Sequence, residues 1–500
     1  MRTTTLAIAS LGLLCVPAAP GQEPPRATEG VRSGACGQRL LAATAPVAIT
    51  PDGDGVADCA VVRIRLERPA TVELVVAQRK PQPRTVHVQR AAASRGLTTL
   101  VWTPGPEAAA RTYVTRVTVT RPGTRVRMEG PVIRVRGIHA RFARESYAPG
   151  DVASLRVDSP VRSLALHIVD LADEQPVSPE RRIAIRGNET NVGVRIGRWR
   201  PGVYAVELHG GGMASRAPLV VRAAAAARPR VAVVLPTTTW EAYNLTDGDS
   251  DGTGDSWYAT RRRESARLGR PFMGDGLPPR FRRDDLPFLR WLRSAERRAD
   301  FITDEDLERV PSAEALARRY DLVVFPGHHE YVTWHEFHLI RDYRDLGGNL
   351  IFLAADNLHW RVVRVGSLLR RKEQWRSIGR PEAAVAGVQY RANDHGTRGA
   401  YVVRNTRCAP WLFRNTRLRV GSKFGWSGVE IDASTAASPR RLCVVAEIPN
   451  LLGAARTAQM TYYETPGGAK AFAAGAFSLP SGYRVMRVML DNLWARLSRP

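Results

Sequence analysis

The alternation of hydrophobic and polar residues predicts different architectures in the first and second halves of the chain. Between residues 36 and 122, short alternating runs are separated by turns rich in Pro and Gly, which is typical of β-strands. The runs are Val61–Leu66, Ala70–Ala77, Thr85–Gln89, Leu97–Trp102 and Tyr113–Thr120. Several short strands at this spacing predict a β-sandwich.

A second β-sandwich is predicted over residues 131–222. Tyr147–Asp151 has the composition of a turn before the strand Val152–Val157, and Trp199–Gly202 has that of a turn before another strand. The Ala-rich segment Ala223–Ala227 then predicts a linker. We expect both β units to be spacers or docking modules rather than catalytic domains.

The pattern changes to that of an α/β protein in residues 229–500. Three continuous apolar runs predict strands buried on both faces, and segments of helical periodicity lie between them. The strands are Val231–Leu235, Leu322–Phe325 and Leu350–Leu353, and the helices are Leu286–Arg297, Ser312–Tyr320 and Phe337–Leu346. Buried strands that alternate with helices predict a three-layer α/β domain, with a parallel sheet between two layers of helices.

Composition and charge narrow the class of protein. A chain that is 44% hydrophobic and 24% charged is neither collagen-like, coiled-coil nor wholly disordered. Its 73 Lys and Arg against 48 Asp and Glu give a formal net charge of +25, yet only four are lysines and the arginines are spread along the chain. A nucleic-acid-binding surface usually mixes both cations in one patch, so we expect no nucleic-acid partner. A basic surface still favours acidic polymers or anionic membranes.

Residues 1–21 have the three-part pattern of a secretory signal peptide. Arg2 precedes an apolar run, and small residues follow in Pro17–Gly21. The run is too short to span a bilayer, and no later segment has about 18 uninterrupted apolar residues. Lipid attachment at Cys15 is the alternative, but Gly12–Leu14 lacks the small residue normally found beside a lipobox cysteine. We predict cleavage, and a secreted or extracytoplasmic protein without a transmembrane segment.

Four cysteines remain after cleavage, and an oxidising compartment favours disulfides between them. The pairs close in sequence are Cys36 with Cys59 and Cys408 with Cys443. Each bridge would contribute on the order of 3 kcal/mol to the free energy of unfolding. Free buried thiols are the alternative. Neither pair has the CxxC spacing of a zinc site.

Polar and aromatic residues follow each of the three strands predicted to be parallel. In open α/β sheets, ligands bind beyond the carboxyl ends of the strands. The loops at these ends are Pro236–Asn244, Pro326–Thr333 and Ala354–Trp360. We therefore expect a functional site where the three loops meet.

Five blocks of sequence in and near these loops resemble one enzyme family. They are Thr-Trp-Glu-Ala-Tyr-Asn at 239–244, Asp-Gly-Thr-Gly-Asp-Ser-Trp-Tyr at 251–258, Thr-Asp-Glu-Asp-Leu at 303–307, Gly-His-His-Glu-Tyr at 327–331 and Asn-Leu-His-Trp at 357–360. In this order they are similar to the C-terminal domain of the large, or beta, subunit of N,N-dimethylformamidase, over about residues 229–500. The resemblance implies hydrolysis of the C–N bond of a small linear amide. The sheet also resembles class I glutamine amidotransferase-like folds.

The first β unit has a resemblance of its own. The stretch Ile49–Asp58, with its Pro-Asp-Gly-Asp-Gly turn, is similar to the opening of Ig-like modules related to the flagellar hook-capping protein. This implies Ig-like topology over about 85 residues.

The dimethylformamidase resemblance implies a ferric ion held by two tyrosines and one glutamate, which by motif position are Tyr243, Tyr258 and Glu330. A free phenol has a pKa near 10, so phenolate ligation at neutral pH needs a hard, highly charged cation such as Fe(III). Such an ion polarises an amide carbonyl and acidifies a bound water. Without the resemblance, both tyrosines would be interpreted as core or rim aromatics.

The same resemblance suggests the remaining catalytic residues. Asn357 would orient the carbonyl, and Glu430 would be the general base for water, with a surface or turn carboxylate as the alternative for Glu430. His328 and His329 are adjacent, so both cannot easily face one metal. We predict a catalytic role for His329 and a structural role for its neighbour.

An acidic segment before Tyr258 has some features of a calcium loop. Asp247, Asp249, Asp251 and Asp255 occupy positions one, three, five and nine, but position twelve is Tyr258 rather than a bidentate acid. A calcium site is one interpretation, and a flexible loop that leads to Tyr258 is the other. A weaker version of the pattern includes residues Asp52, Asp54 and Asp58.

Two absences and one alternative complete the sequence-based hypothesis. The turn Gly327–Tyr331 contains no Cys or Ser, which argues against a nucleophile elbow, and no Walker A or dinucleotide-binding motif follows a strand.

The leading hypothesis is an exported, iron-dependent amide hydrolase. The alternative is a non-catalytic surface or carbohydrate-binding protein that retains the fold and binds a cell-surface polymer. The sequence leaves the oligomeric state open.

Overall fold

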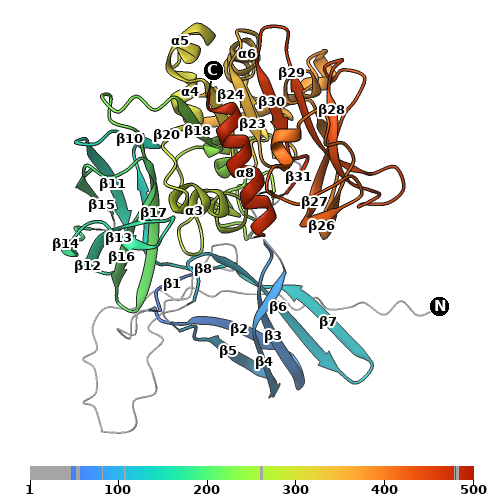
Figure 1. Cartoon of the computed structure of the whole chain (residues 1–500). Coiled ribbons are helices and arrows are strands. Elements are labelled where there is room, and N and C mark those ends of the chain that lie inside the picture. The colour runs from blue at the N-terminus through green and yellow to red at the C-terminus, as the bar shows by residue number, and fades with distance from the viewer. Residues whose placement is uncertain are drawn as a thin grey trace.

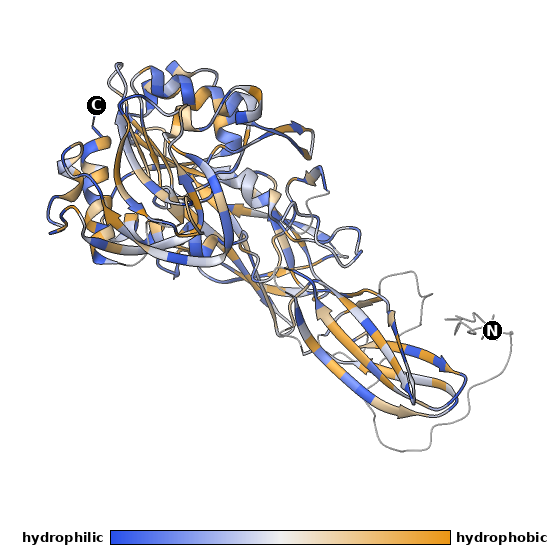
Figure 2. Ribbon diagram, turned by 90° about the vertical axis from the view of Figure 1, so that its right-hand side faces the viewer, coloured by the Kyte–Doolittle hydropathy of each residue, from blue (hydrophilic) through white to orange (hydrophobic). Residues whose placement is uncertain are grey.

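A computed structural model describes three units, which are two β-sandwiches and a larger α/β unit (Figure 1). It describes residues 47–51, 57–80, 83–105, 108–187, 189–258, 263–477, 479 and 483–499. The predicted signal peptide, Cys15, Cys36, Asp52 and Asp54 lie outside these residues. Figure 2 shows the first sandwich projecting from the other two units, with hydrophobic and hydrophilic residues alternating along its strands.

The first sandwich consists of two sheets around one core. One sheet has the order β1 (Val47–Ile49), β8 (Ile133–Val135), β6 (Thr112–Arg121), β3 (Ala70–Gln78) and β4 (Arg84–Ala93). In the same sheet, β7 (Thr124–Glu129) also pairs with β6. The other sheet consists of β2 (Ala60–Leu66) paired with β5 (Gly96–Trp102). Leu74, Leu100 and Ile133 are fully buried between them. β7 and β8 extend this unit past the predicted boundary at residue 122, because β8 pairs with β1 and β6 rather than with the second unit.

The second sandwich repeats this design. One sheet has the order β15 (Glu189–Arg195), β11 (Val152–Asp158) and β9 (His139–Phe142). The other has the order β10 (Ser146–Tyr147), β17 (Met213–Val221), β16 (Gly202–Gly210), β12 (Ser163–Asp170) and β13 (Gln175–Pro176), and β14 (Arg181–Ala184) pairs with β12. Alternate residues of β11 face the core, where Ala153, Leu155 and Val157 are fully buried. The period-two pattern of the sequence therefore sets which face is buried.

The α/β unit contains a ten-stranded sheet. Its order is β20 (Asp300–Thr303), β18 (Val231–Leu235), β21 (Leu322–Phe325), β23 (Asn349–Phe352), β30 (Lys470–Ala473), β29 (Ala458–Glu464), β28 (Cys443–Ile448), β26 (Gln389–Val403), β27 (Lys423–Ala433) and β31 (Ala476–Phe477). The first five strands are parallel, and the others pair antiparallel. The sheet is therefore mixed rather than parallel throughout, because β29, β28, β26, β27 and β31 pair only with antiparallel neighbours, while β30 returns to pair parallel with β23.

Helices cover both faces of this sheet. Val231, Val233 and Leu235 of β18 face the core formed with α3 (Leu286–Ser294) and α8 (Arg484–Leu497). The intervening residues of β18 face the core formed with the two helices on the opposite side, α5 (Ala313–Arg319) and α6 (Trp334–Asp345). The shorter helices are α1 (Thr237–Ala242), α2 (Phe281–Asp284), α4 (Asp304–Glu308) and α7 (Ala383–Ala386). A separate four-stranded sheet has the order β19 (Ser265–Arg267), β25 (Leu368–Gln374), β24 (Trp360–Val365) and β22 (Tyr331–Thr333).

One predicted disulfide is confirmed. Cys408 and Cys443 are bonded, with their Cα atoms 6.5 Å apart. Cys59 is also disulfide-bonded, and its pairing with Cys36 stays a prediction because Cys36 is not described. A disulfide is compatible with an extracytoplasmic location. Within the described part of the chain, no helix combines the length and hydrophobicity needed to cross a membrane.

Polar contacts join the second sandwich to the α/β unit. Ser146 Oγ donates to Asp306 Oδ1 at 2.9 Å, and the Ala223 N–H donates to Asp300 Oδ1 at 2.7 Å. The carboxylate of Glu145 lies 3.6 Å from the Arg364 guanidinium, but its Oε2 atom has no hydrogen-bond partner in the described structure. Burial at this junction raises the pKa of Glu145 to about 7 against the lowering effect of Arg364.

Glu145→Gln is expected to become more stabilising as the pH rises. A carboxyl group whose pKa is about 7 when folded and 4.5 when unfolded costs stability as the pH rises between these values. Glutamine is neutral throughout, so the difference in free energy of unfolding between variant and wild type should increase by about 1–2 kcal/mol from pH 5 to pH 8. Denaturant unfolding at both pH values checks this, with the exposed Glu180→Gln as control. A difference that stays constant or falls would contradict it.

Candidate active site

The three loops selected from the sequence lie at one edge of the sheet. β18, β21 and β23 are adjacent and parallel, so their carboxyl ends point the same way. Tyr243 directly follows α1 in the first loop, and Glu330 follows β21 in the second. Asn357 follows β23 in the third.

Tyr243, Tyr258 and Glu330 lie together at this edge. The Tyr243 hydroxyl donates a hydrogen bond to the Glu330 carboxylate, and the centroids of the two tyrosine rings are 5.7 Å apart. Glu330 is 5% exposed, whereas Tyr258 is 39% exposed. The Glu330 N–H donates to Thr239 Oγ1 at 3.1 Å, which fixes the second loop against α1. Two phenols and one carboxyl group thus converge from separate segments, with Tyr258 on the open side.

An arginine that the sequence did not indicate covers both rings. The Arg280 guanidinium lies 5.5 Å from the centroid of Tyr243 and 4.9 Å from that of Tyr258. Although burial opposes its charge, Glu430 and Tyr243 raise the pKa of Arg280. Its φ of +65° is left-handed, which is uncommon for a residue other than glycine. No local signal in Pro-Pro-Arg predicts this backbone, so sequence reasoning missed it.

His328, rather than His329, is the histidine at this cluster. Its Nε2 atom lies 3.4 Å from Glu330 Oε2, 3.2 Å from Glu430 Oε2 and 3.6 Å from Asp356 Oδ2. Neither ring nitrogen of His328 has a hydrogen bond to another described residue. Three buried carboxyl groups therefore surround Nε2 of His328 at ion-pair distance, without a contact of hydrogen-bond geometry.

His329 lies in a different buried cluster. Its Nε2 atom is 2.5 Å from Glu336 Oε1 and 3.3 Å from Asp304 Oδ1. Burial opposes its charge, but Asp304 and Glu336 raise the pKa of His329. The catalytic role predicted for His329 therefore does not fit its position, because adjacent residues outside a helix point to different sides. In an extended backbone, side chains two residues apart point to the same side, so the sequence could have indicated that His328, two residues before Glu330, shares its side.

We expect His329→Leu to affect stability. Removing the imidazole leaves two buried carboxyl groups without their cationic partner, which should lower the free energy of unfolding by about 3 kcal/mol. Denaturant unfolding of His329→Leu measures the loss, and His209→Leu, at an exposed histidine of the second sandwich, is the control. A variant that unfolds like wild type but loses only turnover would restore the catalytic role.

Asn357 and Glu430 both reach the site. Asn357 Nδ2 donates to the Ala354 carbonyl at 2.9 Å, and its Oδ1 atom has no partner among the described residues. Glu430, on β27, is 4% exposed and therefore neither a surface nor a turn carboxylate. Its Oε1 atom lies 3.7 Å from the Arg280 guanidinium. β27 is held over the edge by Asp432, which accepts the Asp356 N–H at 2.9 Å.

Backbone strain is concentrated in the same residues. Asp356, Leu358 and Val429 have φ angles of +58°, +57° and +71°. The left-handed region is a strong outlier for a β-branched residue such as valine. Strain of this kind persists where surrounding structure enforces it, and it clusters at functional sites. The backbone beside Glu430 and Asn357 is thus held in a conformation that the sequence alone does not favour.

Burial and mutual contact shift the pKa values of the acidic residues. Burial, with Asp356, raises the pKa of Glu330 to about 8, and burial raises that of Glu430 to about 7. Asp356 Oδ1 lies 2.6 Å from His359 Nδ1. Against the effect of burial, this contact raises the pKa of His359 to about 9 and lowers that of Asp356. The cluster therefore holds carboxyl groups with opposite shifts, which is typical of active sites.

An arginine lies among the carboxylates of the acidic loop. Arg263 lies 3.2 Å from Asp249 and 3.7 Å from Asp251, and it is paired with Asp255. Asp247 instead accepts hydrogen bonds from Thr112 Oγ1 at 2.6 Å and from backbone N–H groups. The loop that leads to Tyr258 is thus fixed by the chain's own donors and docked on the first sandwich. A calcium ion at Asp247, Asp249, Asp251 and Asp255 stays a prediction.

Three cavities of the described structure lie away from this cluster. Cavities of ≈ 460, ≈ 330 and ≈ 420 Å³ lie at junctions between the units and are lined by other residues. We place the candidate site by its chemistry, because buried titratable groups with perturbed pKa values and strained backbone converge there.

Comparison with known families decides the assignment. Residues 189–485, more than half of the chain, match the family described as N,N-dimethylformamidase beta subunit-like, C-terminal. The chain belongs to this family. The match includes Tyr243, Tyr258, Glu330, Asn357 and Glu430, and it begins within the second sandwich.

Curated relatives of this family share a shorter segment. The chain is 31% identical over 125 residues to the N,N-dimethylformamidase beta subunit of Alcaligenes sp, and 33% identical over 121 residues to that of Paracoccus aminophilus. Each match covers 23% of this chain and only 15% of the relative. Membership of the dimethylformamidase beta subunit-like family suggests a hydrolase-like function.

Solved structures show only weak structural similarity to this chain. The N-terminal four Ig domains of Dscam1 isoform 8.4 show 9% identity and a TM-score of 0.15, covering 36% of this chain and 43% of that chain. Trypsin-activated alpha-2-macroglobulin from Escherichia coli shows 10% identity and a TM-score of 0.22, covering 36% of this chain and 16% of that chain. Overlaps at these scores carry no argument about fold, so the Ig-like and amidotransferase-like resemblances stay predictions.

Proposed function

We propose that this chain hydrolyses the C–N bond of small linear amides outside the cytoplasm, with a ferric ion held by Tyr243, Tyr258 and Glu330. The observation that carries the proposal is the convergence of two phenols and one buried carboxyl group, joined by the Tyr243–Glu330 hydrogen bond. Family membership supports the hydrolase class.

The residues present fit such an ion. Two phenols and a carboxyl group are a hard oxygen donor set, which suits Fe(III) better than softer metals. Beside them, His328 Nε2 and Glu430 Oε2 are buried atoms without hydrogen-bond partners in the described structure. Arg280 packs over both phenol rings. Burial and the neighbouring Glu330 raise the pKa of Tyr243 well above that of a free phenol, and Arg280 opposes this effect, so the phenolate form of Tyr243 depends on the charge of the cation itself. When bound, the ion would polarise the amide carbonyl and acidify a water molecule.

The other residues supply proton transfer and positioning. In hydrolysis, the water oxygen bonds to the carbonyl carbon and the C–N bond breaks. Glu430 takes the proton from water and returns it to the leaving amine, as a general base and then a general acid. His328, 3.2 Å from Glu430, holds this carboxyl group toward the phenols. Asn357 is fixed by one Nδ2–H bonded to the Ala354 carbonyl, and its second Nδ2–H would donate to the substrate carbonyl.

Amine release from formamide and N,N-dimethylformamide tests this function. We expect the full chain, loaded with ferric iron, to release ammonia or dimethylamine, and the same chain with Glu330→Gln to release none above the uncatalysed rate. A folded, iron-loaded chain without turnover on any linear amide would contradict the proposal. Retention on cell-wall polysaccharide that survives Glu330→Ala would instead support a non-catalytic binding protein.

A further inference from the structure

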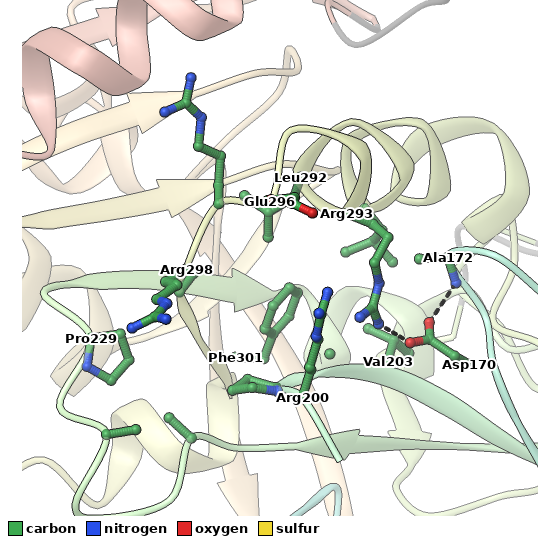
Figure 3. A pocket seen from close by; sticks show the side chains of 17 residues that line it. Asp170, Ala172, Arg200, Val203, Pro229, Leu292, Arg293, Glu296, Arg298 and Phe301 are labelled. Atoms are coloured by element: carbon green, nitrogen blue, oxygen red, sulfur yellow. Dashed lines mark hydrogen bonds and ion pairs between the residues drawn. The ribbon is translucent and has the colours of Figure 1, made fainter. Parts of the chain in front are cut away.

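One of the three cavities, separate from the candidate active site, lies between the second sandwich and the α/β unit. It encloses ≈ 460 Å³ and is bounded by β12 and β16, by the linker after β17, and by α3 and β20 (Figure 3). Cavities that hold small ligands are commonly 300–1,000 Å³ and occur preferentially at domain interfaces. None of the residues placed at the candidate active site lines it.

The floor of this cavity is apolar. Leu289 and Leu292 of α3, Phe301 of β20 and Val203 of β16 contribute side chains to the lining, and each belongs to the larger hydrophobic core. Their own burial makes this floor part of a rigid structure rather than a mobile surface. Ala172, Pro201 and Pro229 also line the cavity and are partly exposed, so an apolar ligand body that covers them removes hydrophobic surface from water.

The rim of the cavity is cationic, and its charge is only partly neutralised. Four arginines and two carboxylates line the cavity, a formal excess of +2. Arg293 is paired with Asp170, and Arg297 lies 3.1 Å from Asp491. Arg200 and Arg298 have no carboxylate within 4.0 Å among the described residues. Figure 3 shows them on either side of Phe301.

We infer that this cavity binds a small organic anion with an apolar body, such as a medium-chain carboxylate. Arg200 and Arg298 supply the charge for the anionic group, while Leu292, Phe301 and Val203 bury the chain. An uncharged apolar molecule leaves the two arginines uncompensated, and a short anion leaves the floor uncovered. The cavity is therefore selective for ligands that carry both features. This inference is independent of the proposed hydrolase function.

Isothermal titration of the full chain with sodium decanoate tests the inference. We expect saturable binding of one decanoate with a Kd of about 100 µM or tighter. 1-Decanol, which has the chain without the charge, and acetate, which has the charge without the chain, should each bind at least about tenfold more weakly. Decanoate binding weaker than about 1 mM, or equal binding of decanol, would overturn the inference.

Substitutions in and outside the cavity lining test whether decanoate binds in this cavity. Arg200→Gln combined with Arg298→Gln should weaken decanoate binding at least about tenfold and remove the preference over decanol. Arg290→Gln changes an exposed arginine of α3 outside the cavity, and its Kd should stay within about twofold of wild type. Ala172→Phe keeps every charge but fills part of the cavity, and it should also weaken binding. Thermal unfolding confirms that each variant is folded. Unchanged binding in the double variant would overturn the inference.

Discussion

Glu330→Gln is expected to lose bound iron and amide hydrolysis together. The Glu330 carboxyl group is buried, accepts the Tyr243 hydroxyl hydrogen and lies beside His328. Glutamine has nearly the same shape but cannot supply an anionic ligand. Loss of Lewis-acid stabilisation worth several kcal/mol corresponds to a fall in kcat/KM of about 1,000-fold or more. Iron per chain and amine release, measured on the same preparation, check both effects.

The control for this prediction is Glu314→Gln, at an exposed glutamate of α5. It removes one carboxylate from the same unit and should leave iron content and kcat/KM within about twofold of wild type. A Glu330→Gln protein that keeps both its iron and its turnover would exclude Glu330 as a ligand.

Glu430→Gln is expected to separate turnover from metal binding. Burial raises the pKa of Glu430 to about 7, which suits a general base near neutral pH, and its Oε2 atom has no hydrogen-bond partner among the described residues. Because Glu430 is outside the proposed Tyr, Tyr and Glu ligand set, iron content should stay at the wild-type level. The kcat should fall by about 100- to 10,000-fold with little change in KM.

This outcome distinguishes a base from a ligand. Steady-state kinetics and iron analysis of Glu430→Gln give the two quantities independently. A parallel loss of iron and turnover would assign Glu430 to the metal, and unchanged kcat would remove it from the mechanism.

The sequence predicted those parts of the fold that depend on local patterns. Continuous apolar runs identified β18, β21 and β23, because burial on both faces requires only hydrophobic residues. The edge rule for α/β sheets then selected the loops of Tyr243, Glu330 and Asn357, and in the structure the first two residues are joined by a hydrogen bond.

Features that depend on long-range pairing were not predicted. The antiparallel half of the sheet places Glu430 and Asp432 over the edge, and such pairing between distant strands leaves little trace in the local pattern. The left-handed backbone of Arg280 and Val429 is imposed by surrounding structure. Composition could not distinguish His328 from His329, since only the direction of each side chain separates the site from the neighbouring buried cluster.

The visible absorption spectrum of the iron-loaded chain tests the central claim most directly. Phenolate ligands give Fe(III) a visible charge-transfer band, so wild type should be coloured, with about one iron per chain. The band should be lost or shifted in Tyr243→Phe and retained in Tyr483→Phe, which changes an exposed tyrosine before α8. A folded wild-type chain that stays colourless and free of iron after exposure to ferric salt would contradict the account.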